Sequence, residues 1–126
     1  MTFYQKGANF ERSIVRDFWE NGFTAIRAAG SGCAPQPIPD VIAMKGSRII
    51  IIECKTTAKP TFRLGKEEIA KLRAFTERAD CEAYLALKFN NVKPKFFPLD
   101  LVAGRTVTKN DTALSFETLL GIQKTL

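Results

Sequence analysis

Histidine is absent from this 126-residue sequence, and cysteine is scarce, with residues only at Cys33, Cys54 and Cys81. The lack of histidine excludes histidine general bases, Ser-His and Cys-His nucleophilic pairs, and zinc fingers with histidine ligands. Three widely spaced cysteines without a C-x-x-C motif predict neither a disulfide framework nor haem attachment, and they favour a reducing compartment. Any chemistry must therefore come from carboxylates, lysines and hydroxyl groups.

Long apolar runs are missing as well. The longest strongly apolar run, Ile49–Ile52, has the length of a strand, whereas a membrane helix needs roughly 20 apolar residues. Residues 1–6 have no apolar stretch behind a basic start, so the sequence predicts no secretion signal. We therefore expect a cytoplasmic protein without membrane association. A chain of this length, with 45% hydrophobic residues, predicts one domain over residues 1–126.

Basic residues outnumber acidic ones. The sequence has 19 Lys and Arg against 13 Asp and Glu, which gives a formal net charge of +6. A positive field attracts polyanions, either nucleic acid or an acidic membrane surface, although many basic proteins bind neither. The basic residues are spread along the chain and not gathered in a tail, so we expect a folded basic surface.

Hydrophobic periodicity and turn residues predict an α/β fold. Apolar residues at helical spacing predict helices over residues 5–21 and 66–78, and Ser115 is typical of the cap of a short helix over 116–121. The proline-rich segment 30–39 predicts a loop. Apolar runs between turns predict strands over residues 23–28, 40–45, 48–56, 82–89 and 93–99. This order predicts a single domain with a mixed central β-sheet flanked by helices.

The most informative pattern is Pro39-Asp40, followed after a predicted hairpin at Gly46-Ser47 by Glu53-Cys54-Lys55. Side chains alternate along a strand, so Glu53 and Lys55 share one face and Cys54 lies on the other. The hairpin brings Asp40 close to Glu53, and two converging carboxylates repel each other unless a cation lies between them. Hard oxygen ligands of this kind suit Mg²⁺ or Mn²⁺.

A simpler interpretation of the same residues is available. An aspartate after proline is often a loop cap, and Glu-x-Lys on a strand is usually a solvated pair. The context favours function, because Glu53 and Lys55 follow four isoleucines in a strand that is expected to be central and covered on both faces. Uncompensated charges are costly in such a strand.

The pattern of Pro-Asp, hairpin and Glu-x-Lys resembles the core of the PD-(D/E)xK nuclease superfamily. Three further segments resemble the archaeal Holliday-junction resolvase (Hjc) family: Lys6-Gly7 with Glu11-Arg12, Arg27 with Gly30-Ser31, and the C-terminal segment Leu119–Leu126. The resemblance spans nearly the whole chain. One departure is the loop Gly32–Ile38, which is longer and richer in proline than the usual connection.

The resemblance implies a restriction-endonuclease-like fold and a structure-selective endonuclease that resolves four-way DNA junctions. It implies hydrolysis that depends on Mg²⁺, for which Mn²⁺ can substitute, and products with 5′-phosphate and 3′-hydroxyl ends. Binding should follow junction shape and phosphates more than bases. Two alternatives stay open: a nuclease of the same superfamily that acts on other DNA in repair or restriction, and a non-catalytic basic nucleic-acid-binding module.

The resemblance also assigns roles to individual residues. Asp40 and Glu53 match the metal ligands, and Lys55 completes the catalytic set. Glu11 matches a helix glutamate that contributes to the metal site, and its simpler interpretation is a surface glutamate. Ser31 matches a mobile-loop serine that is needed for cleavage, and its simpler interpretation is a Gly-Ser-Gly turn.

Five basic residues are assigned to DNA binding. Arg12 and Arg27 match family positions that hold phosphates, Lys6 belongs to the matching helix motif, and Lys66 and Lys88 are predicted phosphate contacts. For Arg12 and Arg27, a solubilising surface residue is the simpler alternative.

Two partners are predicted besides DNA. Resolution needs two nicks on opposing strands, so we expect a homodimer with one site in each subunit. Ile69 and Leu72 are expected in the core, with Phe62 and Leu64 as candidate interface residues. The C-terminal segment Gln123–Leu126 begins like a sliding-clamp binding motif but lacks the aromatic pair, so a clamp contact is only suggested.

Overall fold

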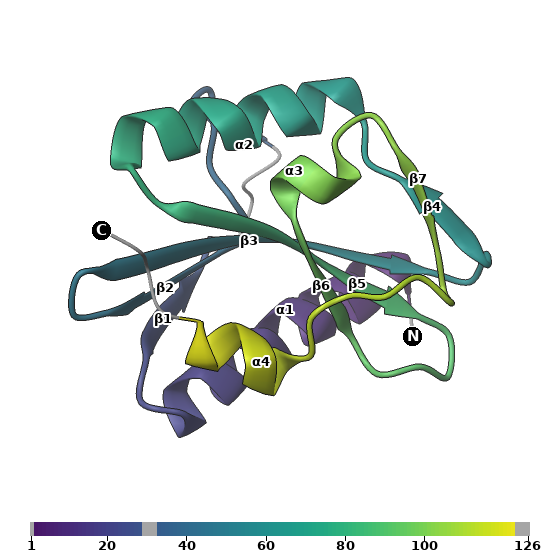
Figure 1. Cartoon of the computed structure of the whole chain (residues 1–126), viewed down its shortest axis with the longest axis horizontal. Coiled ribbons are helices and arrows are strands. Elements are labelled where there is room, and N and C mark those ends of the chain that lie inside the picture. The colour runs from purple at the N-terminus through teal and green to yellow at the C-terminus, as the bar shows by residue number, and fades with distance from the viewer. Residues whose placement is uncertain (1, 29–32, 123–126) are drawn as a thin grey trace.

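The computed structural model describes residues 2–28 and 33–122, and it contains a five-stranded sheet with helices on both faces (Figure 1). The sheet has the order β1-β2-β3-β5-β6, and β4 and β7 form a separate two-stranded sheet. The elements are, in chain order, α1 (Phe3–Glu20), β1 (Thr24–Arg27), β2 (Val41–Lys45), β3 (Arg48–Thr57), β4 (Thr61–Arg63), α2 (Lys66–Ala79), β5 (Glu82–Phe89), β6 (Lys95–Pro98), α3 (Leu99–Val102), β7 (Thr106–Thr108) and α4 (Phe116–Gly121).

Strand β3 is the central strand of the sheet, as its run of isoleucines predicted. It pairs antiparallel with β2 and parallel with β5, so the sheet is mixed. Ile50, Ile51 and Ile52 are fully buried because both faces of this strand are covered. The register pairs Val41 with Ile52, which brings the residue before Val41 next to the residue after Ile52.

Two hydrophobic clusters lie on opposite faces of the sheet. On one face, Ile14 and Phe18 of α1 and Leu119 of α4 pack against Ile50 and Ile52. On the other face, α2 and α3 pack against β3, β5 and β6 through a second buried set, which includes Ile51, Leu72, Leu85, Leu99 and Val102. The figure shows these two layers of helices, with α2 and α3 on one side of the sheet and α1 and α4 on the other (Figure 1).

The local sequence explains where α1 begins and ends. Thr2 and Gln5 form a capping box at its start, so the helix begins two residues before the predicted Gln5. It ends at Asn21-Gly22, where Gly22 has a φ of 85° that favours glycine. Trp19 near the end of this helix is 56% exposed, and its indole Nε1 donates a 2.8 Å hydrogen bond to the carbonyl of Ala25.

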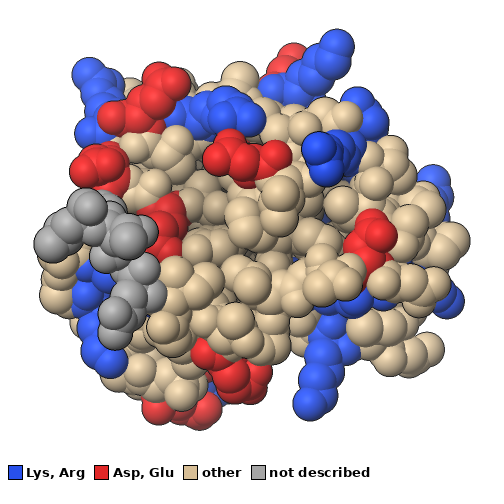
Figure 2. Space-filling view, viewed as in Figure 1, with Lys and Arg blue, Asp and Glu red and all other residues tan. Residues whose placement is uncertain are grey.

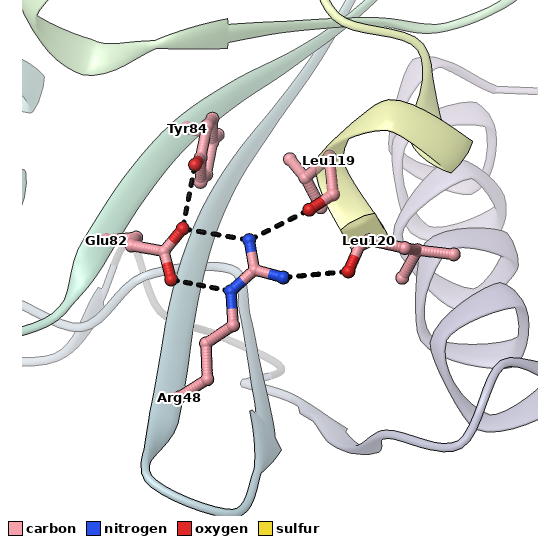
Figure 3. A network of polar contacts seen from close by, with 5 residues as sticks. All are labelled: Arg48, Glu82, Tyr84, Leu119 and Leu120. Carbon is pink, nitrogen blue, oxygen red and sulfur yellow. Dashed lines mark hydrogen bonds and ion pairs between the residues drawn. The ribbon is translucent and has the colours of Figure 1, made fainter. Parts of the chain in front are cut away.

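Arg48 at the start of β3 organises a polar network that fixes α4 to the sheet (Figure 3). Its guanidinium donates two hydrogen bonds to the carboxylate of Glu82, at 2.7 and 2.9 Å. It also donates to the carbonyls of Leu119 and Leu120, at 2.8 and 3.0 Å. The hydroxyl of Tyr84 donates to Glu82 at 2.8 Å, and burial together with Glu82 raises the pKa of Tyr84 to about 12. The network therefore satisfies unpaired carbonyls at the end of a helix.

The structure corrects several predictions. Strand β6 is shorter than the predicted 93–99, and β4, β7 and α3 were not predicted. Leu64 was predicted as an interface residue, but it is 3% exposed and belongs to the core under α2, against which Phe62 is partly buried. Ile69 also packs on this cluster, as predicted. In the described part of the chain, no helix combines the length and hydrophobicity of a membrane-spanning segment.

Candidate active site

The β2–β3 hairpin brings Asp40 and Glu53 together, as the spacing predicted. Both carboxylates are buried, with 9% and 3% of the residue exposed. Asp40 Oδ2 accepts a 2.9 Å hydrogen bond from the backbone N–H of Cys54, which fixes its position. Lys55 lies on the same face of β3 as Glu53, and its Nζ is 3.8 Å from Glu53 Oε2. Cys54 belongs to the opposite hydrophobic cluster, as strand alternation requires.

Glu53 is in an environment that opposes its negative charge. Burial raises the pKa of Glu53 to about 8, and the neighbouring Asp40 carboxylate adds to this effect. Among the described residues, no donor forms a hydrogen bond with Glu53 Oε1, although this oxygen has an exposed area below 1 Å². A buried carboxylate oxygen without a hydrogen bond is costly unless a cation is bound nearby. The buried carboxyl groups of Asp40 and Glu53 therefore fit a bound divalent cation.

Glu11 of α1 lines the same cavity, but its carboxylate already has a partner. Its Oε1 is 2.9 Å from Arg27 Nε, and both side chains are less than one-fifth exposed. Burial and the nearby Asp40 raise the pKa of Glu11, and Arg27 opposes this shift. Within residues 2–28 and 33–122, no three acidic or cysteine side chains are arranged so that they could together hold a metal ion. Two carboxylates are sufficient for Mg²⁺, which usually keeps several waters and binds substrate phosphates.

Helix α2 contributes two residues that the sequence analysis did not assign to the site. Glu68 forms an ion pair with Lys55, and Lys71 Nζ is 3.6 Å from Glu53 Oε1. Both flank the predicted apolar stripe of α2, so the helical spacing contained this information, but the rotation of the helix about its axis was unknown. These two residues, together with Glu53 and Lys55, line a cavity of about 420 Å³. The residues around this cavity are Glu11, Ala34, Gln36, Asp40, Glu53, Cys54, Lys55, Glu67, Glu68 and Lys71.

The predicted basic DNA contacts differ in their surroundings. Arg12 and Lys66 are exposed, and Lys6 is exposed with its Nζ 3.5 Å from Asn90 Oδ1. Arg27 lies beside the cavity through its ion pair with Glu11. Lys88 is half-buried and donates hydrogen bonds to the carbonyls of Phe89 and Val92, so it stabilises the turn after β5. Their contacts with DNA stay predictions.

Two predicted features lie outside the described residues. These are Ser31 in the loop after β1 and the C-terminal segment 123–126 with its suggested clamp motif. On the described surface shown in Figure 2, acidic and basic side chains are interleaved along α2, and the area below the helix is largely uncharged. Three of the charged residues of α2, Glu67, Glu68 and Lys71, line the cavity.

Comparison with known proteins supports the same interpretation. A family model for the archaeal Holliday junction resolvase (Hjc) matches residues 2–126. The chain is 39% identical over 97 residues to the crossover junction endodeoxyribonuclease Hjc of Archaeoglobus fulgidus, over 77% of this chain and 71% of that protein. It is 42% identical over 87 residues to the crossover junction endodeoxyribonuclease Hjc of Methanocaldococcus jannaschii, over 69% of this chain and 62% of that protein.

A solved structure has the same fold. The structure of Archaeoglobus fulgidus Hjc, described as a Holliday junction resolvase from an archaeal hyperthermophile, matches with a TM-score of 0.74 and 34% identity. The match covers 80% of this chain and 85% of that one, and it confirms the predicted mixed α/β fold. A family model over nearly the whole sequence and a relative with 39% identity agree that this chain belongs to the archaeal Holliday junction resolvase (Hjc) family.

Proposed function

We propose that this protein is a crossover junction endodeoxyribonuclease that resolves four-way DNA junctions by metal-dependent hydrolysis at the Asp40-Glu53-Lys55 site. The observation that carries the proposal is the buried Glu53 carboxylate beside Asp40, with one oxygen that accepts no hydrogen bond from the described residues. Family membership supports the substrate, because the related proteins are described as Holliday junction resolvases. The activity would serve DNA recombination and repair.

Asp40 and Glu53 would hold the metal, with Glu11 as a further candidate ligand. We propose Mg²⁺ as the ion, with Mn²⁺ as a substitute, because both prefer hard carboxylate oxygens. Such an ion supplies Lewis-acid activation of water and of the scissile phosphate. The hydrogen bond from the Cys54 backbone to Asp40 supports this assignment, because it orients one carboxylate before any ion arrives.

Lys55 contributes a positive charge next to the two carboxylates. Its ammonium group would orient the attacking water and neutralise the negative charge that develops on the phosphate oxygens. Attack on phosphorus opposite the leaving oxygen breaks the P–O3′ bond and yields 5′-phosphate and 3′-hydroxyl ends. Arg12, Arg27, Lys6, Lys66 and Lys88 would hold phosphates, and Ser31 would act in cleavage from the loop after β1.

We also propose that the protein acts as a homodimer, because one chain carries one Asp40-Glu53-Lys55 set and resolution needs two nicks. An apolar sheet face supports this proposal. Ile26 of β1 and Met44 of β2 are 52% and 36% exposed. Ile26 pairs with Ile42, which extends this apolar surface toward the core under α2. Such a face is a candidate isologous interface.

A mixed dimer tests whether two sites act together. A heterodimer with one wild-type and one Asp40→Asn subunit should nick one strand of a four-way junction and should not release two duplexes. If the mixed dimer resolves junctions as efficiently as the wild-type dimer, the two-site proposal is wrong.

The principal experiment is cleavage of a labelled four-way junction with Mg²⁺ or with a chelator, in the presence of excess linear duplex. The proposal predicts Mg²⁺-dependent paired nicks that the linear duplex does not suppress. Suppression by linear duplex would favour the alternative, a repair or restriction-type nuclease. Binding without cleavage in Mg²⁺ or Mn²⁺ would favour a non-catalytic binding module.

A further inference from the structure

Helix α2 places an acid and a base against the proposed catalytic pair on β3. Glu68 and Lys71 are three residues apart, so they lie on one side of the helix, one turn from each other. Glu68 Oε2 forms an ion pair with Lys55 Nζ, and Lys71 Nζ lies 3.6 Å from Glu53 Oε1. Lys55 and Glu53 of β3 therefore each have an oppositely charged partner on α2, and all four side chains line the cavity.

The position of Lys55 depends more on Glu68 than on Glu53. The distance from Lys55 Nζ to Glu53 Oε2 is 3.8 Å, which is too long for a hydrogen bond. The contact with Glu68 is shorter, and the side chains of Lys55 and Glu68 are each 32% exposed. A lysine has a flexible four-carbon stem and holds one orientation only when a fixed partner restrains its ammonium group. In the described part of the site, Glu68 provides the shorter of the two carboxylate contacts.

We infer that Glu68 is a positioning residue for junction cleavage: it holds the ammonium group of Lys55 in place and away from the Glu53 carboxylate. This inference rests on the proposed function, since it gives Lys55 its catalytic role. Without Glu68, Glu53 is the ion-pair partner that Lys55 keeps among the described residues, and the ammonium group would compete with the metal for that carboxylate. Lys71, one turn further along α2, balances the charge of Glu53.

If the ion pair between Lys55 and Glu68 only fixes α2 to the sheet, a different result is expected for the Glu68 variant. A partly exposed pair contributes little to stability, and if the Lys55–Glu68 pair only fixes α2, its loss should leave the cleavage rate of the folded protein unchanged. A positioning residue acts through its partner, so its effect disappears when the partner is removed. The cleavage rate of the folded Glu68→Ala variant separates the two roles, and a double-mutant cycle between positions 55 and 68 shows whether the effect acts through Lys55.

The experiment measures single-turnover cleavage of a four-way junction at saturating Mg²⁺ for Glu68→Ala, Lys55→Ala and the double variant. We expect Glu68→Ala to lower the cleavage rate by roughly 10- to 100-fold, the range for lost supporting contacts. Junction affinity should stay within about threefold, because the change affects the reacting geometry. In the Lys55→Ala background, Glu68→Ala should change the residual rate by less than about twofold.

Three further variants make the result specific. Glu68→Asp keeps the charge and should recover part of the rate, and Glu68→Gln keeps the shape in case the alanine variant unfolds. Glu77→Ala removes an exposed acid of the same helix and should cleave at the wild-type rate. The inference is overturned if Glu68→Ala cleaves within twofold of wild type, or if it loses the same factor with and without Lys55. Wild-type cleavage by Lys55→Ala would instead overturn the proposed role of Lys55 itself.

Discussion

Strand β3 carries two partly buried charge clusters, one at its start and one near its middle, and they differ in how well their polar atoms are satisfied. At its start, Arg48 and Glu82 form paired hydrogen bonds, and the guanidinium also reaches two carbonyls at the end of α4. Further along, Glu53 is buried beside Asp40, and no described residue donates a hydrogen bond to one of its oxygens. The first cluster is closed by partners within the chain, and the second has room for a cation.

This difference indicates a structural role for the cluster around Arg48 and a functional role for the cluster around Glu53. The aligned donors and acceptors around Arg48 connect the start of β3, the start of β5 and the end of α4, and they stabilise one arrangement. Around Glu53, burial and a like charge raise the pKa to about 8, which is an energetic cost to the folded protein. Such costs are concentrated at functional sites, where a ligand offsets them.

The largest expected effect comes from a substitution in the cluster of Asp40 and Glu53, which has room for a cation. Asp40→Asn should lower junction cleavage by roughly 10³-fold, because it removes a proposed metal ligand from an electrostatically preorganised site. The asparagine Oδ1 can still accept the hydrogen bond from Cys54, so the fold and junction binding should persist. Single-turnover cleavage and a gel-shift titration measure the two quantities. Cleavage at the wild-type rate would show that Asp40 is not a ligand.

A substitution in the cluster of Arg48 and Glu82 should affect stability instead. Arg48→Met should lower the free energy of unfolding by about 2–4 kcal/mol, because it leaves the Glu82 carboxylate and two carbonyls without their partner. Urea denaturation measures this change, and the cleavage rate of the folded variant should stay within about threefold of wild type. Arg73→Met is the control: its pair with Asp100 is exposed, and its loss should cost less than about 0.5 kcal/mol.

The pH dependence of stability should reflect Glu53. Its pKa is raised from 4.5 to about 8 in the folded protein, so the folded state binds a proton that the unfolded state has lost. Without metal, the stabilising contribution is complete below pH 4.5 and is lost as the pH rises toward 8, at up to about 1.4 kcal/mol per pH unit. Glu53→Gln should flatten this part of the curve. Identical curves for the two proteins, measured by urea denaturation with chelator, would contradict the shift.

The smallest expected effect concerns Arg27, which pairs with Glu11 beside the cavity that Asp40 and Glu53 line. Arg27→Ala should weaken junction binding and reduce the slope of log affinity against log salt by about one, as for one lost phosphate contact. Arg16→Ala, on the exposed side of α1, is the matched control and should leave the slope unchanged. An unchanged slope for Arg27→Ala would mean that this residue serves Glu11 and does not contact DNA.

The sequence was sufficient to predict the central hairpin, because the evidence for it is local. The isoleucine run, the Gly46-Ser47 turn and side-chain alternation together determine that Asp40 lies beside Glu53 and that Cys54 lies on the other face. Strands β4 and β7 were missed because each is three residues long and pairs with a segment far away in the chain. Such pairing depends on tertiary contacts and not on a local pattern.

The charged residues of α2 show a second limit of sequence reasoning. The spacing of Ile69 and Leu72 identifies the face of α2 that packs on the core, but not what lies at the border of that face. Glu68 and Lys71 meet Lys55 and Glu53 only because β3 and α2 are packed in this orientation. For the same reason, Leu64 was predicted at the surface and is buried under the helix.

The most direct test compares two glutamates that differ in how their oxygens are satisfied. Glu53→Gln and Glu82→Gln each replace one partly or fully buried carboxyl group by an amide, and both the cleavage rate and the free energy of unfolding are measured for each variant. We predict that Glu53→Gln loses roughly 10³-fold in cleavage without loss of stability, and that Glu82→Gln loses about 2 kcal/mol and keeps its rate within about threefold. If both variants lose stability and keep cleavage, or if Glu82→Gln abolishes cleavage while Glu53→Gln does not, the account of the two clusters is wrong.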